Sequence, residues 1–134
     1  MLLLDNGPQA LCMDDRVVLT YQKSLSERPA SRDRVAGVYT IDWGVYAFTI
    51  ALNADGQLTG SDTEGCVLNG TFTVPNGNRN EYHIATDVEL CPSQGTYSGD
   101  AFLADGDDPN DNKVLLLSLV SADAKFRIFQ WLQR

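Results

Sequence analysis

Short runs of alternating apolar and polar residues, separated by glycine-containing turns, constrain this chain more than any other feature. The cleanest run places Tyr46, Phe48, Ile50 and Leu52 at every second position. This is the spacing at which the side chains of a β-strand share one face. Residues 53–56 follow as Asn-Ala-Asp-Gly, the composition of a hairpin turn with a glycine available for positive φ. An antiparallel hairpin is therefore predicted here, with the bulky residues in the core.

Similar runs recur between residues 38 and 133, and an earlier one covers residues 16–22. They correspond to about eight or nine short strands at hairpin spacing. The predicted fold class is all-β, an antiparallel meander forming a small barrel or a sandwich. The length of 134 residues fits a single β domain over residues 1–134, in which residues 1–15 are poorly defined.

One segment differs from this pattern. Ser31-Arg32-Asp33-Arg34-Val35-Ala36-Gly37 has a serine suited to a helix N-cap and a glycine suited to a C-cap. We expect one short helical turn near residues 30–36. It is too short to be stable alone, so it is expected to plug or cross one end of the sheet.

Cys66 and Cys91 flank a second predicted hairpin, in which residues 67–74 pair with 82–90 about a turn at 75–80. Counting outward from the turn places the two cysteines nearly opposite each other. A disulfide between them would fix the register of the hairpin, and two buried reduced thiols are the alternative. A bridge would leave Cys12 unpaired and would indicate maturation in an oxidising compartment.

The charge balance excludes several classes of partner. Ten basic residues against eighteen acidic ones give a formal net charge of −8, which repels nucleic-acid phosphates and anionic lipid. The apolar run near Met1 has neither the length of a membrane span nor the basic flank of a secretory signal. We expect no nucleic-acid partner, no membrane-spanning segment, and a chain that begins inside a longer one.

Two glycine-rich motifs carry a family resemblance. They are Gly-Cys-Val-Leu-Asn-Gly-Thr at 65–71 and Gly-Thr-Tyr-Ser-Gly at 95–99, and Ala-Gly-Val-Tyr-Thr at 36–40 accompanies them. Over roughly residues 16–134 the chain resembles the C-terminal β domain of a loose group of uncharacterised proteobacterial exported proteins and lipoproteins. The resemblance implies a β fold, a structural disulfide, and a periplasmic or exported location in the envelope. It implies no activity.

The acidic loop at 105–112 is the sharpest candidate for a metal site. Carboxylates of Asp105, Asp107, Asp108 and Asp111 could offer oxygen ligands to calcium. Pro109 stands where an EF-hand loop needs Asp or Asn, and no glutamate closes the loop. We therefore favour a solvated turn and predict no metal and no cofactor.

His83 is the only histidine, and alternation places it with Asp87 and Glu89 on the polar side of its strand. No nucleophile-elbow motif accompanies it. The chain is predicted not to be an enzyme. A small hydrolase with two paired carboxylates is the third and weakest alternative.

The last strand supplies a candidate partner surface. Phe126, Ile128 and Leu132 are expected to face the core, in alternation with Arg127 and Gln130. Phe129 and Trp131 then lie on the opposite face, exposed or covered by the N-terminal segment. Exposed apolar patches mark interfaces, in which tryptophan is enriched.

The leading hypothesis is a non-enzymatic envelope domain that binds another protein. The alternative is a lipocalin-like barrel that carries a small apolar ligand. A continuous internal cavity of several hundred cubic ångströms would favour the alternative.

Overall fold

A computed structural model describes residues 27–109 and 111–134 of the chain. Its described part is all-β, and eight antiparallel strands pair in sequence order to form a closed barrel. The predicted meander is confirmed, as a barrel. The predicted strand at 16–22 and Cys12 lie outside the described residues. The elements are α2 (Arg32–Val35), β2 (Gly37–Asp42), β3 (Ala47–Leu52), β4 (Gln57–Asp62), β5 (Val67–Thr73), β6 (Tyr82–Glu89), β7 (Gly95–Ala104), β8 (Val114–Ser121) and β9 (Arg127–Gln133).

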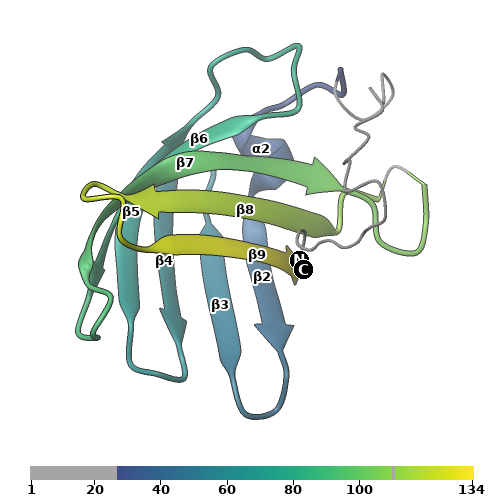
Figure 1. Cartoon of the computed structure of the whole chain (residues 1–134). Helices are drawn as coiled ribbons and strands as arrows, with labels where there is room; N and C mark the ends of the chain where they lie inside the picture. Colours follow the sequence, from purple (N-terminus) through teal and green to yellow (C-terminus); the bar gives the residue numbers. More distant parts are fainter. Residues whose placement is uncertain (1–26, 110) are drawn as a thin grey trace, which may run out of the picture.

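The barrel is strongly coiled, so that strands β2 to β5 run across the direction of strands β6 to β9 (Figure 1). Glycines on the inner face permit this. A Cβ atom at Gly70 would overlap the carbonyl oxygen of Ala85, and one at Gly99 would overlap that of Ser118. In-strand glycines of this kind mark barrel corners and close backbone approach.

The helical turn α2 closes one end of the barrel (Figure 1). The Ser31 side chain accepts a hydrogen bond from the Arg34 amide, which confirms the predicted N-cap. Val35 is fully buried, and its carbonyl oxygen accepts a hydrogen bond of 2.7 Å from the Tyr39 hydroxyl. The predicted glycine C-cap is wrong: Ala36 caps the helix, and Gly37 begins β2 instead.

The core runs through the barrel, from Val35 beneath the helical turn to Phe48, Leu68 and Val88 at the other end. Tyr39, Tyr82 and Phe72 are among its largest buried side chains, and the last two meet edge to face with ring centres 6.4 Å apart. Hairpin β5–β6 has the predicted register, with Phe72 opposite Ile84. Strands β3 and β6 show the strictest alternation of buried with less buried residues.

Two residues of the last hairpin lie on faces other than those predicted. Phe126 directly precedes β9 and is exposed, so it does not face the core. Gln130 lies in phase with Ile128 and Leu132, so it faces inward, and its assignment to the polar face was wrong.

We predict that Gly70→Ala lowers the free energy of unfolding by about 1–3 kcal/mol, because the added methyl group overpacks the β5–β6 contact. Gly77→Ala is the matched control, since the nearest atom to a Cβ there is 3.7 Å away. Urea titration of both variants measures the difference. Equal stabilities would show that the corner does not depend on glycine.

We also predict a loss of stability at alkaline pH that depends on Tyr39. Burial raises the pKa of Tyr39 to about 12, although nearby Arg134 acts in the opposite direction. An unfolded tyrosine ionises near pH 10, so above that pH the unfolded chain releases a proton that the folded chain retains. The free energy of unfolding should fall between pH 10 and 12.

The Tyr39→Phe variant should lose stability less steeply over this pH window, by up to about 1.4 kcal/mol per pH unit. Urea titrations at pH 8, 9, 10, 10.5 and 11 measure the slope separately from the stability lost with the Val35 hydrogen bond. Parallel slopes for the two proteins above pH 10 would contradict the prediction.

Candidate functional site

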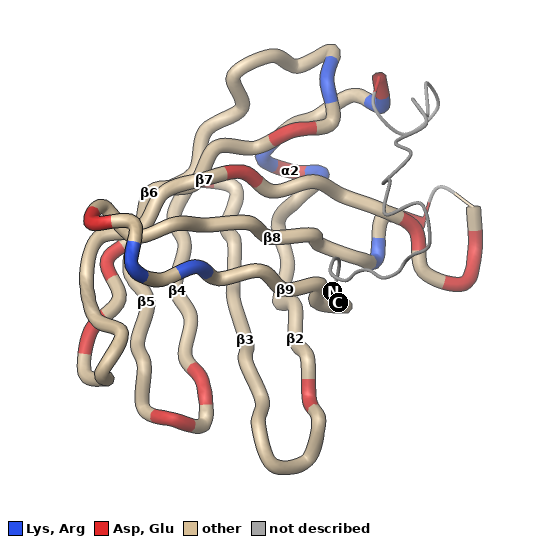
Figure 2. The backbone as a smooth tube through the Cα atoms, viewed as in Figure 1, with Lys and Arg blue, Asp and Glu red and all other residues tan. Residues whose placement is uncertain are grey.

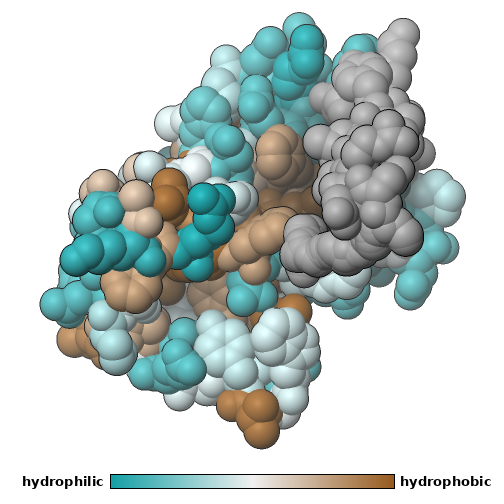
Figure 3. Space-filling model, viewed as in Figure 1, coloured by the Kyte–Doolittle hydropathy of each residue, from teal (hydrophilic) through white to brown (hydrophobic). Residues whose placement is uncertain are grey.

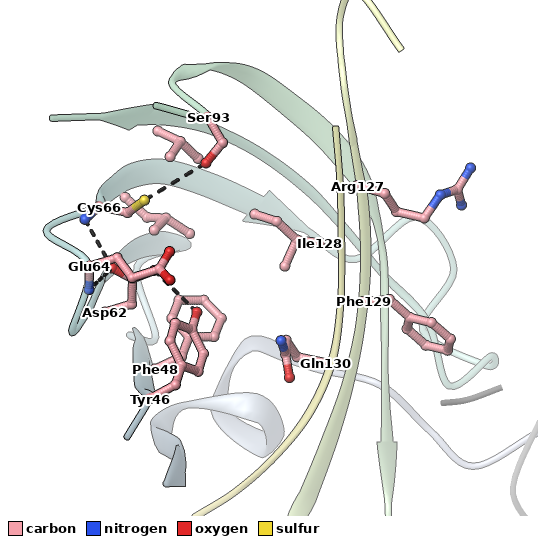
Figure 4. Close-up of a pocket in the computed structure, with 12 residues that line it drawn as sticks. Tyr46, Phe48, Asp62, Glu64, Cys66, Ser93, Arg127, Ile128, Phe129 and Gln130 are labelled. Carbon is pink, nitrogen blue, oxygen red and sulfur yellow. Dashed lines mark hydrogen bonds between the residues drawn. The ribbon is translucent and has the colours of Figure 1, made fainter. Parts of the chain in front are cut away.

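A pocket of about 330 Å³ lies at the end of the barrel opposite α2, which we call the open end. Its apolar walls come from strands β3, β5, β6 and β9, through Phe48, Leu68, Val88 and Ile128. Figure 4 shows Ile128 and Gln130 pointing into the pocket, whereas Arg127 and Phe129 point away from it. The pocket therefore belongs to the inside of the barrel.

The pocket exists because β9 leaves β2 early. Strand β9 pairs with β8 along its whole length, from Arg127 opposite Val120 to Gln133 opposite Val114. With β2 it forms a single residue pair among the described residues, Thr40 with Gln133. Toward the open end β2 and β9 diverge. There the first half of β9 still pairs with β8 on one side, and on its other side it borders the pocket.

Asp62 and Tyr46 form the polar rim of the pocket on the side of β3 and β4. One Asp62 carboxylate oxygen accepts the backbone N–H groups of Glu64 and Cys66, at 2.9 and 3.0 Å. The other accepts the Tyr46 hydroxyl at 3.1 Å. Burial raises the pKa of Tyr46, and the negative charge of Asp62 raises it further. Tyr46 thus stays a neutral donor, and Asp62 is fixed by the turn that it caps.

Gln130 supplies the polar group on the other side. Its side chain points into the pocket (Figure 4), and its amide makes no hydrogen bond with another residue in the described part of the chain. An inward-facing amide without a protein partner can donate to or accept from a bound molecule. The sequence offered a signal that was missed: Gln130 lies two residues from both Ile128 and Leu132.

The mouth of the pocket is acidic. Asp62 and Glu64 line it, and Arg127, the basic residue among the described lining residues, turns its guanidinium outward (Figure 4). Figure 2 shows Asp and Glu on the β4–β5 bend and at the end of β2, on the same end of the barrel. The local charge disfavours anions and favours neutral or cationic molecules.

Cys66 and Cys91 are joined by a disulfide beside this pocket. Their Cα atoms are 4.9 Å apart, within the range that a disulfide tolerates. Cys66 lines the pocket, and its amide is one of the two backbone N–H groups that donate to Asp62. The predicted pairing is confirmed, and the bridge links the β4–β5 bend to the segment after β6. An oxidising, exported location is compatible with it.

The acidic loop uses its carboxylates within the chain. Asp105 accepts two hydrogen bonds from the guanidinium of buried Arg28, at 2.7 and 3.2 Å. Asp111 accepts the backbone N–H groups of Gly106, Asp108 and Lys113, which lower its pKa. Asp107 and Asp108 are exposed. The arrangement holds the loop's shape, and the preference for a solvated turn over a calcium site at these residues stays a prediction.

The predicted partner surface is on the outside of the barrel. Phe129 is 48% exposed and Trp131 62% exposed. The register aligns Trp131 with Leu116 of β8 and Phe102 of β7, and we call these three residues the outer row. Apolar atoms gather over these strands on the face shown in Figure 3.

Comparison of the chain with protein-family models, with curated proteins and with solved structures gave no match in any of the three. The resemblance to exported proteobacterial proteins therefore stays a prediction. Among residues 27–109 and 111–134, no helix has the length and apolar character needed to cross a bilayer.

We predict that the intact protein, denatured without reductant, has one titratable thiol per chain, from Cys12, and three after reduction. Cys12→Ser should lower the first count to zero. Replacing both Cys66 and Cys91 by serine should cost about 3–4 kcal/mol of stability, because the bridge closes a loop with a sequence separation of 25. Three thiols before reduction would contradict the bridge.

Proposed function

We propose that this protein binds a small molecule with an apolar body and a neutral or cationic polar end, in the pocket at the open end of the barrel. The observation that carries the proposal is the pocket of about 330 Å³, which lies at the small end of the range for ligand pockets. The pocket opens to solvent, so it is not a continuous internal cavity of the kind that a lipocalin-like carrier encloses. We rank a small-molecule ligand above a protein partner because the inward-pointing side chains of Ile128 and Gln130 line this pocket.

The lining supports this ligand class. Phe48, Leu68, Val88 and Ile128 offer apolar contact area, while Gln130 and Tyr46 stand at the polar rim. About half of the lining residues are polar or charged, among them Asp62, Glu64 and Gln130, so the pocket suits an amphipathic molecule better than a wholly apolar one. Asp62 and Glu64 add negative charge at the mouth, so an alkylamine should enter more readily than a carboxylate of equal length.

The role is one of binding, without catalysis. Asp62 serves as the cap of its turn and the acceptor of the Tyr46 hydroxyl. Hydrogen-bond donors lower the pKa values of Asp111 and Asp123, which are carboxyl groups of the described part of the chain. A general acid needs a raised value. Within residues 27–109 and 111–134, these two lowered pKa values give no support to the hydrolase alternative.

The test compares octylamine with octanoate, which share a chain length and differ in charge. Each displaces the neutral fluorescent probe N-phenyl-1-naphthylamine from the untagged protein at low salt. We expect octylamine to displace the probe at concentrations at least about tenfold lower, a difference of about 1.4 kcal/mol. Glu64→Gln should reduce the difference between the displacing concentrations of octylamine and octanoate, because it removes one negative charge from the mouth of the pocket.

Variants locate the probe. Ile128→Trp should fill the pocket and abolish probe binding, while Trp131→Ala, at an outward position of the same strand and outside the pocket lining, should leave binding unchanged. Thermal unfolding of both variants checks that they are folded. If Trp131→Ala abolishes binding and Ile128→Trp does not, the probe occupies the outer surface and the proposal fails.

A protein partner on the outer row is the second candidate function. The observation in its favour is the alignment of Phe102, Leu116 and Trp131 across three strands, with Phe102 39% and Trp131 62% exposed. An envelope location accords with the disulfide. The test of a protein partner on the outer row is affinity capture from a native envelope extract, once with the wild-type protein and once with the double variant Phe102→Ser/Trp131→Ser. A partner retained by both proteins would exclude the outer row as its binding site.

A further inference from the structure

A cluster of three potential metal ligands lies on the outside of the barrel, away from the pocket. Glu81 directly precedes β6, His83 is the second residue of that strand, and Asp100 lies on β7. The register pairs His83 with Asp100. Since side chains at 81 and 83 share a face of the strand, all three project from the same patch of the outer surface.

The distances suit a transition-metal ion. His83 Nε2 lies 3.3 Å from Asp100 Oδ1, and one ligand atom from each of the three residues lies within 4.8 Å of the other two. Two ligands bound to zinc at about 2.1 Å in tetrahedral geometry are about 3.4 Å apart. The His83–Asp100 pair already has this spacing. A small rotation of the Glu81 side chain would bring its carboxylate to the same distance from both and so complete the three-ligand set.

The ligand chemistry narrows the metal. One imidazole nitrogen and two carboxylates are suited to zinc and similar divalent transition metals, whereas calcium and magnesium prefer oxygen ligands throughout. Three protein ligands on adjacent strands leave a fourth position for water or for a group from another molecule. Both side chains of the His83–Asp100 pair are about half exposed, at 55% and 49%, so an ion can reach them from solvent.

We propose that Glu81, His83 and Asp100 form a surface binding site for a divalent transition-metal ion, with Zn²⁺ as the reference ion. In the sequence, His83 was grouped with Asp87 and Glu89 on the strand's polar side, and no metal was predicted. The assignment of His83, Asp87 and Glu89 to the exposed face of β6 is confirmed, and the ligand atoms that lie close to the His83 imidazole are those of Asp100, from the next strand, and of Glu81. This inference is independent of the proposed ligand pocket.

The single histidine makes the test unusually direct. We would titrate ZnCl₂ at pH 7.5 into untagged Cys12→Ser protein, which removes a competing thiol, and follow the only imidazole signals by long-range ¹H–¹⁵N NMR. The expected result is a shift of the His83 Nε2 resonance that saturates at one equivalent. A tenfold excess of Mg²⁺ or Ca²⁺ over Zn²⁺ should not reverse it.

Variants separate a three-ligand site from a lone imidazole. Glu81→Gln and Asp100→Asn should each weaken Zn²⁺ binding about tenfold or more, as loss of a supporting ligand does. Asp87→Asn is the matched control, because Asp87 lies on the same strand and face but accepts a hydrogen bond from Thr96. The proposal would be overturned if Glu81→Gln and Asp100→Asn bound Zn²⁺ with the same affinity as Asp87→Asn and the parent protein. It would also be overturned if the His83 Nε2 signal did not move at one millimolar Zn²⁺.

Discussion

The short contact between β2 and β9 is the constraint on which the rest of this barrel depends. Within the described chain it consists of one residue pair, Thr40 with Gln133, and Arg134 supports it. The Arg134 guanidinium donates to the Ala36 carbonyl at 2.9 Å and lies 5.3 Å from the centre of the Tyr39 ring. Closure is therefore concentrated at the α2 end. Toward the open end the strands separate, and this separation leaves room for the pocket.

The two ends of the barrel differ accordingly in what fills them. At the α2 end, the buried rings of Tyr39, Phe72 and Tyr82 pack beneath Val35. The hydroxyl groups of Tyr39 and Tyr82 form hydrogen bonds with the backbone of the α2 segment. At the open end no helix formed by residues 27–109 or 111–134 covers the core. There the apolar walls meet a polar rim made of Tyr46, Asp62 and Gln130. The disulfide stabilises the bend that forms part of this rim.

The sequence was sufficient for local features and insufficient for contacts between distant strands. Alternation and turn chemistry predicted hairpin β5–β6 with its register, because both depend on neighbouring residues. Whether the sheet closes depends on β2 meeting β9, about ninety residues apart in the chain, and no local pattern encodes that. The pocket shares this origin, since its walls come from four strands. Gln130 could have been placed correctly, because counting from Ile128 puts it on the inner face.

The most direct test of the central claim, a ligand pocket inside the incompletely closed end, is a set of intermolecular NOEs from bound octylamine to methyl groups. Leu68, Val88 and Ile128 carry methyl groups inside the pocket, and Leu116 carries them in the outer row. The account predicts NOEs from the alkyl chain to the first three residues and none to Leu116. NOEs to Leu116 alone would contradict it, because the ligand would then occupy the outside of a barrel whose interior is closed.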